Sequence, residues 1–312
     1  MIAAGIDVSK HTCQVCILHS DSPRSSLLNS SFPNTNDGLI SIVDALQLHN
    51  VTHVLMEATG GLEQLAHRSL EAAGFKVAVC NPLQARHFAR SLGQREKTDP
   101  VDAFALARQQ LALQPAPTPA RPELDELRRL VLRREQLVDM IKQERLHSQS
   151  PAALDEQSYS TVETFLEEQL KAIETRIDEL IQKREELKLK SESIRSVPGV
   201  GKVGVYVLLA CLPELGTLSS KQIAKMVGVA PMKQESGQFK GKAMIQGGRR
   251  EVRNLLYMCA VAGLRWNAWI KEIYEKHKHK GGKHALVVCM RRLLICLNRL
   301  VKNKAKWREV AG

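Results

Sequence analysis

The chain has 312 residues, enough for two domains that each bury a core without disulfide bonds. Hydrophobic residues make up 44% of it, as in ordinary globular proteins, whereas aromatic residues make up 4%, which excludes a protein built around aromatic base-stacking platforms. The formal net charge is +12, and residues 233–312 hold the whole excess, with 19 Lys and Arg against 5 Asp and Glu. Because neutralising phosphates releases condensed counterions, this local excess predicts a polyanionic partner.

The start of the chain, Met1–Asp7, lacks the basic region of a signal peptide and reaches an acid at once, and no apolar run reaches the length of a membrane span. We therefore expect a protein of the cytoplasm with no membrane partner. The seven cysteines are scattered. Cys13 and Cys16 form a C-x-x-C pair in a predicted strand, where a spacing of three points the side chains to opposite faces. No second pair completes a zinc site, so the cysteines are expected to pack as thiols.

The first 113 residues alternate between strand and helix patterns. Apolar runs predict four strands, at Ala4–Val8, Cys13–Leu18, Val51–Met56 and Lys76–Cys80. Apolar residues at helical spacing predict four helices, at Gly38–Leu48, Leu62–Ala73, Leu83–Leu92 and Pro100–Leu113. Two strands followed by strand–helix–strand–helix indicate an α/β sheet domain over residues 1–113.

Residues 114–190 predict a linker followed by helices. Four prolines between positions 115 and 122 cannot occupy a helix interior and indicate a stiff linker. Two long helices are expected beyond it, at Glu123–His147 and Thr161–Lys190. Apolar residues of the second helix follow heptad spacing, at Leu166, Leu170, Ile173, Ile177, Leu180 and Leu187. This pattern predicts a coiled coil, formed either by the two helices of one chain or between two chains.

Residues 191–312 are expected to form a mainly α-helical, basic domain. The Gly-rich turn at Val197–Lys202 lies between two helical patterns, where it is either a plain turn or a phosphate seat at a helix N-terminus. A glycine- and lysine-rich loop is expected at Gly237–Gly248. Further helices are predicted at Ser220–Val227, Arg250–Leu264, Asn267–His277 and Ala285–Val301.

Four acidic residues stand out by their context. Asp7 interrupts the first apolar strand, and Glu57 ends the third. Asp99 is a natural N-cap with Pro100 at the first helical position, and Asp102 shares one face of that opening turn. Capping or solvation would explain each acid singly. Together they favour convergence at one edge of a sheet, where Mg²⁺ or Mn²⁺ offsets their repulsion and can clamp a phosphoryl transfer.

Several short motifs resemble those of the DEDD transposases, the IS-one-ten family of insertion-sequence transposases, which includes the Piv-type DNA invertases. In the first half they are G-I-D-V-S-K at 5–10, M-E-A-T-G at 56–60, N-P at 81–82 and K-T-D-P-V-D-A at 97–103. In the second half they are P-G-V-G at 198–201, E-S-G at 235–237, K-G-K at 240–242, G-G-R at 247–249, R-N-L-L-Y-M at 253–258 and a closing helix at 283–294. The resemblance covers nearly the whole chain.

The resemblance implies a fold, a site and partners. It implies a RuvC-like, RNase H-like N-terminal domain with a tetrad of Asp7, Glu57, Asp99 and Asp102 that binds Mg²⁺ or Mn²⁺. It implies a C-terminal transposase domain with Ser236 as a nucleophile that forms a transient phosphoserine link to DNA. Double-stranded DNA and a guide-type non-coding RNA would be its partners, in the nucleoid of a bacterial cytoplasm. Because recombination cuts four strands, a homo-oligomer is expected, either a dimer or a tetramer.

Basic residues around the serine and the Gly-rich turn are the predicted nucleic-acid contacts, with a solvated basic face as the alternative for each. They are Lys202, Lys240, Lys242, Arg249, Arg250 and Arg253.

The sequence thus favours a DNA transposase or site-specific recombinase. A hydrolytic RuvC-like nuclease or junction resolvase would need the tetrad but not Ser236. A non-catalytic nucleic-acid-binding protein with a coiled-coil dimer contact would tolerate the loss of Asp7 or Glu57. Transposition and Piv-type inversion use the same residues, so the sequence leaves both open.

Overall fold

A computed structural model of the chain describes residues 1–94, 98–150, 156–232, 235–236, 239–240 and 244–307. The chain divides into two compact units, Met1–Pro122 and Glu123–Gly312, which we call unit 1 and unit 2.

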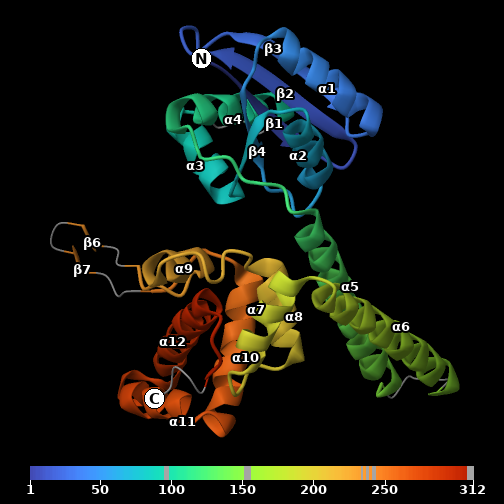
Figure 1. The fold of residues 1–312 in the computed structure, drawn as a ribbon, viewed down its shortest axis with the longest axis vertical. Coiled ribbons are helices and arrows are strands. Elements are labelled where there is room, and N and C mark those ends of the chain that lie inside the picture. Colours follow the sequence, from blue (N-terminus) through green and yellow to red (C-terminus); the bar gives the residue numbers. More distant parts are fainter. Residues whose placement is uncertain (95–97, 151–155, 233–234, 237–238, 241–243, 308–312) are drawn as a thin grey trace. The chain divides into compact units, whose positions relative to one another are not determined.

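Unit 1 is built on a five-stranded mixed sheet (Figure 1). Its strands are β1 (Ile2–Val8), β2 (Thr12–His19), β3 (Ser26–Pro33), β4 (His53–Glu57) and β5 (Lys76–Cys80). Their order is β3-β2-β1-β4-β5, with β1, β2 and β3 antiparallel and β1, β4 and β5 parallel. This confirms the α/β class predicted for the N-terminal domain and shows that its sheet is mixed.

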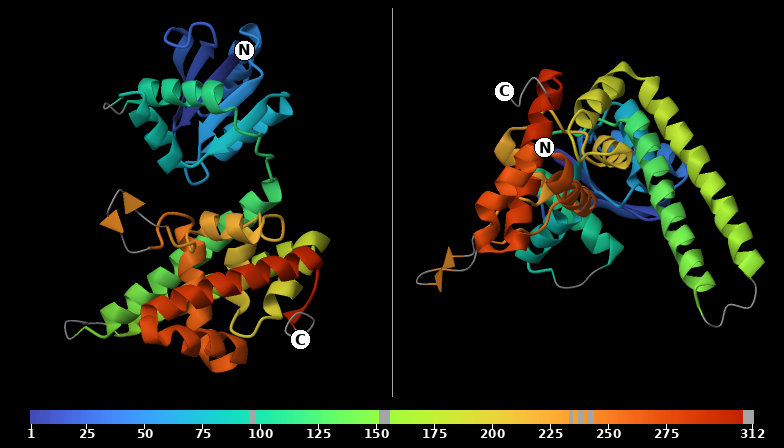
Figure 2. Two further views of the ribbon diagram at one scale, coloured as in Figure 1. Left: turned by 90° about the vertical axis from the view of Figure 1, so that its left-hand side faces the viewer. Right: turned by 90° about the horizontal axis from the view of Figure 1, so that it is seen from below.

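Helices cover both faces of this sheet (Figures 1 and 2). One face packs on α1 (Asn36–Leu48) and α2 (Glu63–Ala72), and the other on α3 (Pro82–Ser91) and α4 (Asp99–Leu113). Cys13 belongs to the first of these cores and Cys16 to the second, which confirms that the C-x-x-C pair points to opposite faces. All seven cysteines are free thiols.

Two features of unit 1 were not predicted. The edge strand β3 has alternating exposed and half-buried residues with few apolar ones, so its sequence lacks a strand signal. The proline-rich segment is held against the other edge of the sheet by Thr118. Its N–H donates to the carbonyl oxygen of Val77 (2.8 Å), and its hydroxyl accepts from the N–H of Val79 (3.2 Å). His67 Nε2 donates to the Thr118 carbonyl oxygen (2.8 Å).

Unit 2, where the structure describes it, is helical apart from one small hairpin. Its helices are α5 (Pro122–Ser148), α6 (Glu156–Gln182), α7 (Glu185–Arg195), α8 (Lys202–Cys211), α9 (Ser220–Val227), α10 (Arg250–Trp266), α11 (Ala268–His277), the short η1 (Lys278–Lys280) and α12 (Gly282–Asn303). The hairpin strands are β6 (Glu235–Ser236) and β7 (Phe239–Lys240), within and beside the stretch for which only a loop was predicted. One apolar core joins residues of α5 through α12. In the part of the chain that the structure describes, no helix is both long and apolar enough to cross a membrane.

The long helices α5 and α6 lie antiparallel and side by side (Figures 1 and 2), as one of the two alternatives for the predicted coiled coil requires. Arg134 pairs with Glu174 (2.8 Å), and Arg145 pairs with Glu163 (2.6 Å). The single helix predicted over Thr161–Lys190 is wrong. Helix α6 ends at Gln182 and α7 begins at Glu185, because the intervening Arg184 has an extended backbone (φ −121°). The heptad positions from Leu166 to Leu180 therefore lie on α6, whereas the last one, Leu187, lies on α7.

Candidate functional site

Asp7 and Glu57 lie next to each other at the ends of two parallel strands. Ile6 of β1 is paired with Met56 of β4, so the next residues along each strand, Asp7 and Glu57, are neighbours. Neighbouring strands are about 4.8 Å apart, and residues in register project from the same face. Both side chains are partly buried. The sheet itself brings these two predicted acids together.

Gly5 allows helix α4 to lie directly on this face of the sheet. A Cβ atom at Gly5 would be 2.2 Å from the amide nitrogen of Ala107 and 2.3 Å from the carbonyl oxygen of Ala103. Residues two apart in a strand share a face, so α4 covers the face from which Asp7 projects. A glycine in a strand interior often marks such a close approach of another backbone.

The first turn of α4 lies at the end of the sheet that carries the two acids. The Asn29 side chain donates to the carbonyl oxygen of Pro100 (3.3 Å) and accepts from the Gln14 side chain (2.7 Å). Gln14 is the residue of β2 that pairs with Asp7. Two hydrogen bonds thus connect the start of α4 to the position opposite Asp7. Asp102 lies on this first turn, at the same end of the sheet.

Asp99 is the first helical residue of α4 and is exposed. The prediction that it is the N-cap is wrong, because Thr98 occupies that position with an extended backbone (φ −138°). Pro100 follows inside the first turn, where its missing N–H has no helical partner to lose. Asp99 and Asp102 also stabilise the start of α4 through the helix dipole, whatever else they bind.

The chemistry of this acidic set fits a divalent cation, because carboxylate oxygens are the hard ligands that Mg²⁺ and Mn²⁺ prefer. Among residues with a described position, however, no three His, Cys, Asp or Glu side chains are gathered closely enough to hold an ion. The backbone therefore brings the acids to one end of the sheet without closing their side chains into a ligand cage.

The two strand-end acids affect neighbouring thiols. Burial, followed by the negative charge of Glu57, raises the pKa of Cys80 to about 12; Cys80 is paired with Glu57 across β4 and β5. Burial, followed by the charge of Asp7, raises the pKa of Cys13 to about 11. Negative charge at this end of the sheet is thus strong enough to be felt by the nearest ionisable groups.

The turn that follows Glu57 is held by Glu63, which the sequence did not single out. One carboxylate oxygen of Glu63 accepts the N–H groups of Thr59 (3.1 Å) and Gly61 (2.8 Å) and the Thr59 hydroxyl (2.7 Å). Burial alone would raise the pKa of Glu63, but the hydrogen bonds outweigh it and lower the pKa. A buried carboxylate, with three hydrogen bonds to one of its oxygens, therefore fixes the loop at the end of the strand that carries Glu57.

In unit 2, Ser236 lies in strand β6, and its backbone is paired with Phe239 of β7. Met232 and Met244 form an isolated bridge farther from the tip of the same hairpin. Lys240 ends β7, and Lys242 lies outside the described residues. The predicted nucleophile is thus part of a short hairpin.

Arg249 is tied to the protein by a two-pronged ion pair. Its guanidinium nitrogens lie 2.5 and 2.6 Å from the two carboxylate oxygens of Glu214, and one of them also donates to the carbonyl oxygen of Cys211 (2.9 Å). Such bidentate pairs are the strong, geometrically specific ones. Arg249 therefore anchors the start of α10. Glu214 was missed because it lies 35 residues away in sequence and belongs to no motif.

Gly247 and Gly248, which precede Arg249, lie in close contact with Gly228 at the end of α9. A Cβ atom at Gly228 would be 2.1 Å from the carbonyl oxygen of Gly247, and one at Gly248 would be 2.3 Å from the amide nitrogen of Gly228. Arg253 donates to the carbonyl oxygen of Gly247. The G-G-R block thus has a structural role, since it fixes where α10 begins.

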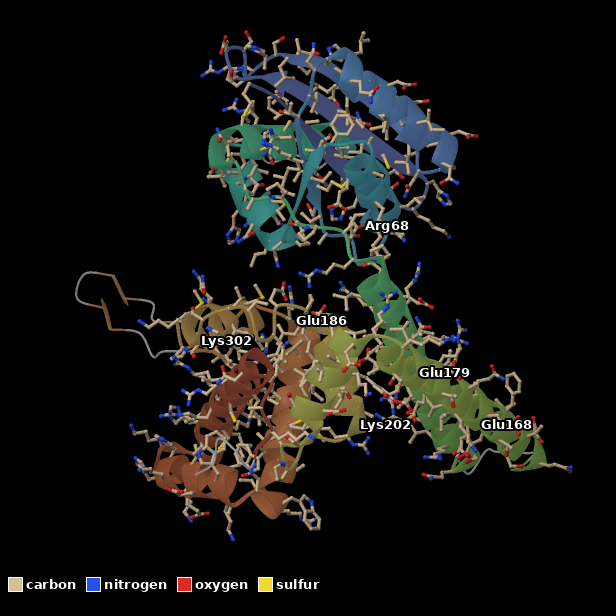
Figure 3. The ribbon with its side chains drawn as sticks, in the orientation of Figure 1. Arg68, Glu168, Glu179, Glu186, Lys202 and Lys302 are labelled. Atoms are coloured by element: carbon tan, nitrogen blue, oxygen red, sulfur yellow. The ribbon has the colours of Figure 1, made fainter. Side chains whose placement is uncertain are left out.

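Lys202, labelled in Figure 3, also has partners within unit 2. Its ammonium nitrogen lies 2.9 Å from a carboxylate oxygen of Asp178 and 3.6 Å from one of Glu174. Hydrogen bonds to Asp178 and Tyr206 raise its pKa. Of the four predicted nucleic-acid contacts whose side chains are described, Arg250 alone is exposed without an ion pair or hydrogen bond in the described structure.

Comparison with known families matches both halves of the chain. A model of DEDD-type IS110 transposases, described as "Transposase", matches residues 4–159, which is half of the chain. A second model, described as "Transposase IS116/IS110/IS902 family", matches residues 191–275.

Individual relatives extend over nearly the whole length. The pilin gene-inverting proteins of Moraxella lacunata and Moraxella bovis are each 29% identical over 307 residues, covering 93% of this chain and 92% of their own. Among solved structures, T. thermophilus RuvC in complex with a Holliday junction substrate aligns with 38% of this chain and 99% of its own, at 15% identity and a TM-score of 0.32.

Proposed function

The chain belongs to the IS110 family of transposases and is therefore a DNA recombinase, and from this premise we propose how it cuts and rejoins DNA strands. The proposed machinery consists of an acidic tetrad in unit 1, a serine nucleophile in unit 2 and basic residues near the serine. The tetrad consists of Asp7, Glu57, Asp99 and Asp102, and the nucleophile is Ser236. The observation that supports it best is the side-by-side placement of Asp7 and Glu57 at the end of the sheet to which the first turn of α4 is tied.

The tetrad would hold Mg²⁺ or Mn²⁺. Such an ion, when bound, lowers the pKa of a hydroxyl group and offsets charge on the phosphate. Asp7 and Glu57 provide neighbouring oxygens from the sheet, and Asp102 and Asp99 provide oxygens from one face of the first turn of α4. Binding requires their side chains to rotate toward a common point, which the partly exposed positions of Asp7, Glu57 and Asp102 allow.

Ser236 would carry the covalent step. Its hydroxyl loses a proton, its Oγ atom bonds to phosphorus, and a deoxyribose oxygen leaves as a hydroxyl group. In the rejoining step, a deoxyribose hydroxyl of another strand attacks the phosphoserine and Ser236 Oγ leaves. Each step exchanges one phosphate ester for another, so no nucleoside triphosphate is consumed.

Lys240, Lys242 and Arg250 are proposed as direct phosphate contacts. Lys202, Arg249 and Arg253 are proposed to act in support, because each holds a partner within unit 2 that it would have to release first. Two further partners are proposed: a guide-type RNA, as the resemblance of the sequence motifs implies, and further copies of the chain. At least two active sites are needed to cut four strands.

Inversion is the second candidate outcome, because both curated relatives named above are pilin gene-inverting proteins. A plasmid that carries one invertible segment and one separate target site distinguishes the outcomes. Inversion restores a reporter on the same plasmid, whereas transposition moves the segment to the target.

The first test is a denaturing-gel assay for covalent protein–DNA adducts, with Mg²⁺, flanking DNA of the element and its co-transcribed RNA. Wild type is compared with Ser236→Ala and Asp7→Asn. Matched controls are Ser220→Ala, an exposed serine on α9, and Asp37→Asn, an acid at the start of α1 on the other side of the sheet. Calorimetric titration with Mn²⁺ measures binding by the same acids independently of cleavage.

We expect adducts in wild type and in both controls, and none in the two site variants. Asp7→Asn should also weaken Mn²⁺ binding, whereas Asp37→Asn should not. Nicking that persists in Ser236→Ala, without any adduct in wild type, would instead establish a hydrolytic nuclease. Binding of DNA with neither cleavage nor adducts would leave a non-catalytic binding protein.

A further inference from the structure

Helix α10 presents a row of side chains to solvent that has no described partner within unit 2. Its members recur at helical spacing, and we call them the α10 ridge: Arg250, Asn254, Tyr257, Met258, Val261 and Arg265. At 1.5 Å per residue, the ridge is about 22 Å long. The opposite face of α10 carries Val252, Leu256, Cys259, Ala260 and Gly263, which are buried in the core of unit 2.

The middle of the ridge is apolar and its two ends are basic. Tyr257, Met258 and Val261 are 45%, 62% and 38% exposed, so three adjacent apolar side chains face water. Arg250 and Arg265 stand at the two ends, and both are exposed. Glu251, the acid of the first turn of α10, is exposed beside Arg250 at one end of the ridge. Contiguous apolar surface edged by charge commonly marks a binding site.

The charge of this part of the chain selects the partner. Residues 233–312 carry 19 Lys and Arg against 5 Asp and Glu, so a second copy of the same face would be repelled. A polyanion is attracted instead. A duplex exposes only base edges in its grooves, because its base faces are stacked. An unpaired strand offers both phosphates for the guanidinium groups and apolar base faces for Tyr257 and Met258.

We propose that the α10 ridge binds unpaired bases of a DNA or RNA strand. One base stacks on the Tyr257 ring against the Met258 side chain, and Arg250 and Arg265 contact phosphates on either side. The Tyr257 ring, between the guanidinium groups of Arg250 and Arg265, accommodates one or two bases. Such a small stacking site agrees with the low aromatic content of the chain. The proposal deepens the proposed function, since a recombinase exposes unpaired strands while it exchanges them.

The test compares binding of three fluorescent oligonucleotides of equal length to the full chain: a single strand with bases, the same strand made abasic, and a duplex. DNA and RNA versions of the single strand distinguish the two sources. Variants are Tyr257→Leu, Tyr257→Phe and the double variant Arg250→Gln with Arg265→Gln. Lys221→Gln, an exposed lysine on α9, controls for overall charge. Circular dichroism verifies that each variant folds.

Wild type should bind the single strand about tenfold more tightly than the abasic strand, because stacking contributes that order of affinity per base. Tyr257→Leu should remove this difference and Tyr257→Phe should retain it. The double arginine variant should weaken binding to both strands and reduce the dependence of log affinity on log salt by about 1.4, or about 0.7 for each lost phosphate contact. Lys221→Gln should change the salt dependence by less than half as much as the double arginine variant does.

Three results would overturn the proposal: equal affinity for base-bearing and abasic strands, tighter binding of the duplex through Tyr257, or an oligomer that Tyr257→Leu dissociates while strand binding is unchanged. The last result, measured by sedimentation equilibrium, would identify the ridge as a contact between copies. The adduct assay on the same proteins keeps the two proposals separate. Adducts without base-dependent binding refute the ridge alone, and base-dependent binding without adducts refutes the recombination chemistry alone.

Discussion

Replacing Gly5 with alanine tests the contact that places α4 on the sheet. The new Cβ atom would lie 2.2 Å from the Ala107 nitrogen and 2.3 Å from the Ala103 oxygen, both backbone atoms that cannot rotate away. Ordinary contact distances are about 3.5 Å, so α4 must move from β1 by about 1 Å. Overpacking of this kind costs about 1–3 kcal/mol of folding free energy. The same shift moves Asp102 relative to Asp7, and misplacement of about 1 Å can reduce a catalytic rate about 100-fold.

The chain provides its own reference for the stability measurement. All three tryptophans and all four tyrosines lie beyond residue 158, in unit 2. Tryptophan fluorescence therefore reports the unfolding of unit 2, whereas far-UV circular dichroism reports both units. With a urea dependence of about 1–3 kcal/mol per M, Gly5→Ala should lower the midpoint of the unit 1 transition by about 1 M and leave the fluorescence transition in place.

Gly74→Ala separates loss of stability from displacement of α4. Gly74 has a left-handed backbone (φ +92°), and no atom lies within 4 Å of its Cβ position. Alanine there costs about 1–2 kcal/mol through backbone strain without pushing a helix. It should therefore destabilise unit 1 to a similar extent but preserve adduct formation. If Gly5→Ala keeps wild-type stability and activity, or if Gly74→Ala loses as much activity, the proposed placement of Asp102 is refuted.

Three further predictions concern single contacts. The pKa of Glu63 is lowered in the folded state. Its contribution to the stability of unit 1 is therefore present above the unfolded pKa of about 4.3 and is lost as the pH falls through the folded pKa. Glu63→Gln should destabilise unit 1 in urea at pH 7, and the difference in stability from wild type should disappear in acid. Glu214→Gln should lower the stability of unit 2 by about 1 kcal/mol, because both groups of the ion pair with Arg249 are partly exposed. Unfolding in urea is followed by tryptophan fluorescence, and an unchanged midpoint would mean that the pair contributes nothing to stability. Burial raises the pKa of Cys16 and Cys80 to about 12. Neither thiol should therefore react with a disulfide reagent at pH 8 until urea unfolds unit 1. Labelling of either cysteine in the native protein would contradict its burial.

Much of unit 1 could be predicted from local patterns, because its inner strands are nearly continuous apolar runs. Strand β5 was predicted with its observed bounds, and β4 within two residues at its start and one at its end. Strand β3 could not be predicted, since an edge strand with polar residues on both faces has no hydrophobic alternation. The break at Arg184 was equally hidden, because neither glycine nor proline marks it.

For the candidate site, the sequence identified which acids end strands but not what supports them. The close approach at Gly5 and the turn held by Glu63 depend on tertiary contacts that no local pattern encodes. The basic candidates were chosen by their charge and their position near the serine and the Gly-rich turn, and neither could show that Arg249 and Lys202 have acidic partners in unit 2. Ser236 still rests on its motif, since the structure describes its strand but tests no chemistry there.

The bonds between Thr118 and β5 have a consequence for handling the N-terminal unit alone. Strand β5 is at the open edge of the sheet, and outward-facing N–H and C=O groups at such an edge recruit strands of other molecules. Thr118 occupies two of these groups, at Val77 and Val79, and so blocks the middle of the edge. A fragment that ends at Leu113 would leave this edge unpaired and prone to aggregate, whereas a fragment that ends at Pro122 would keep Thr118 bonded to the edge.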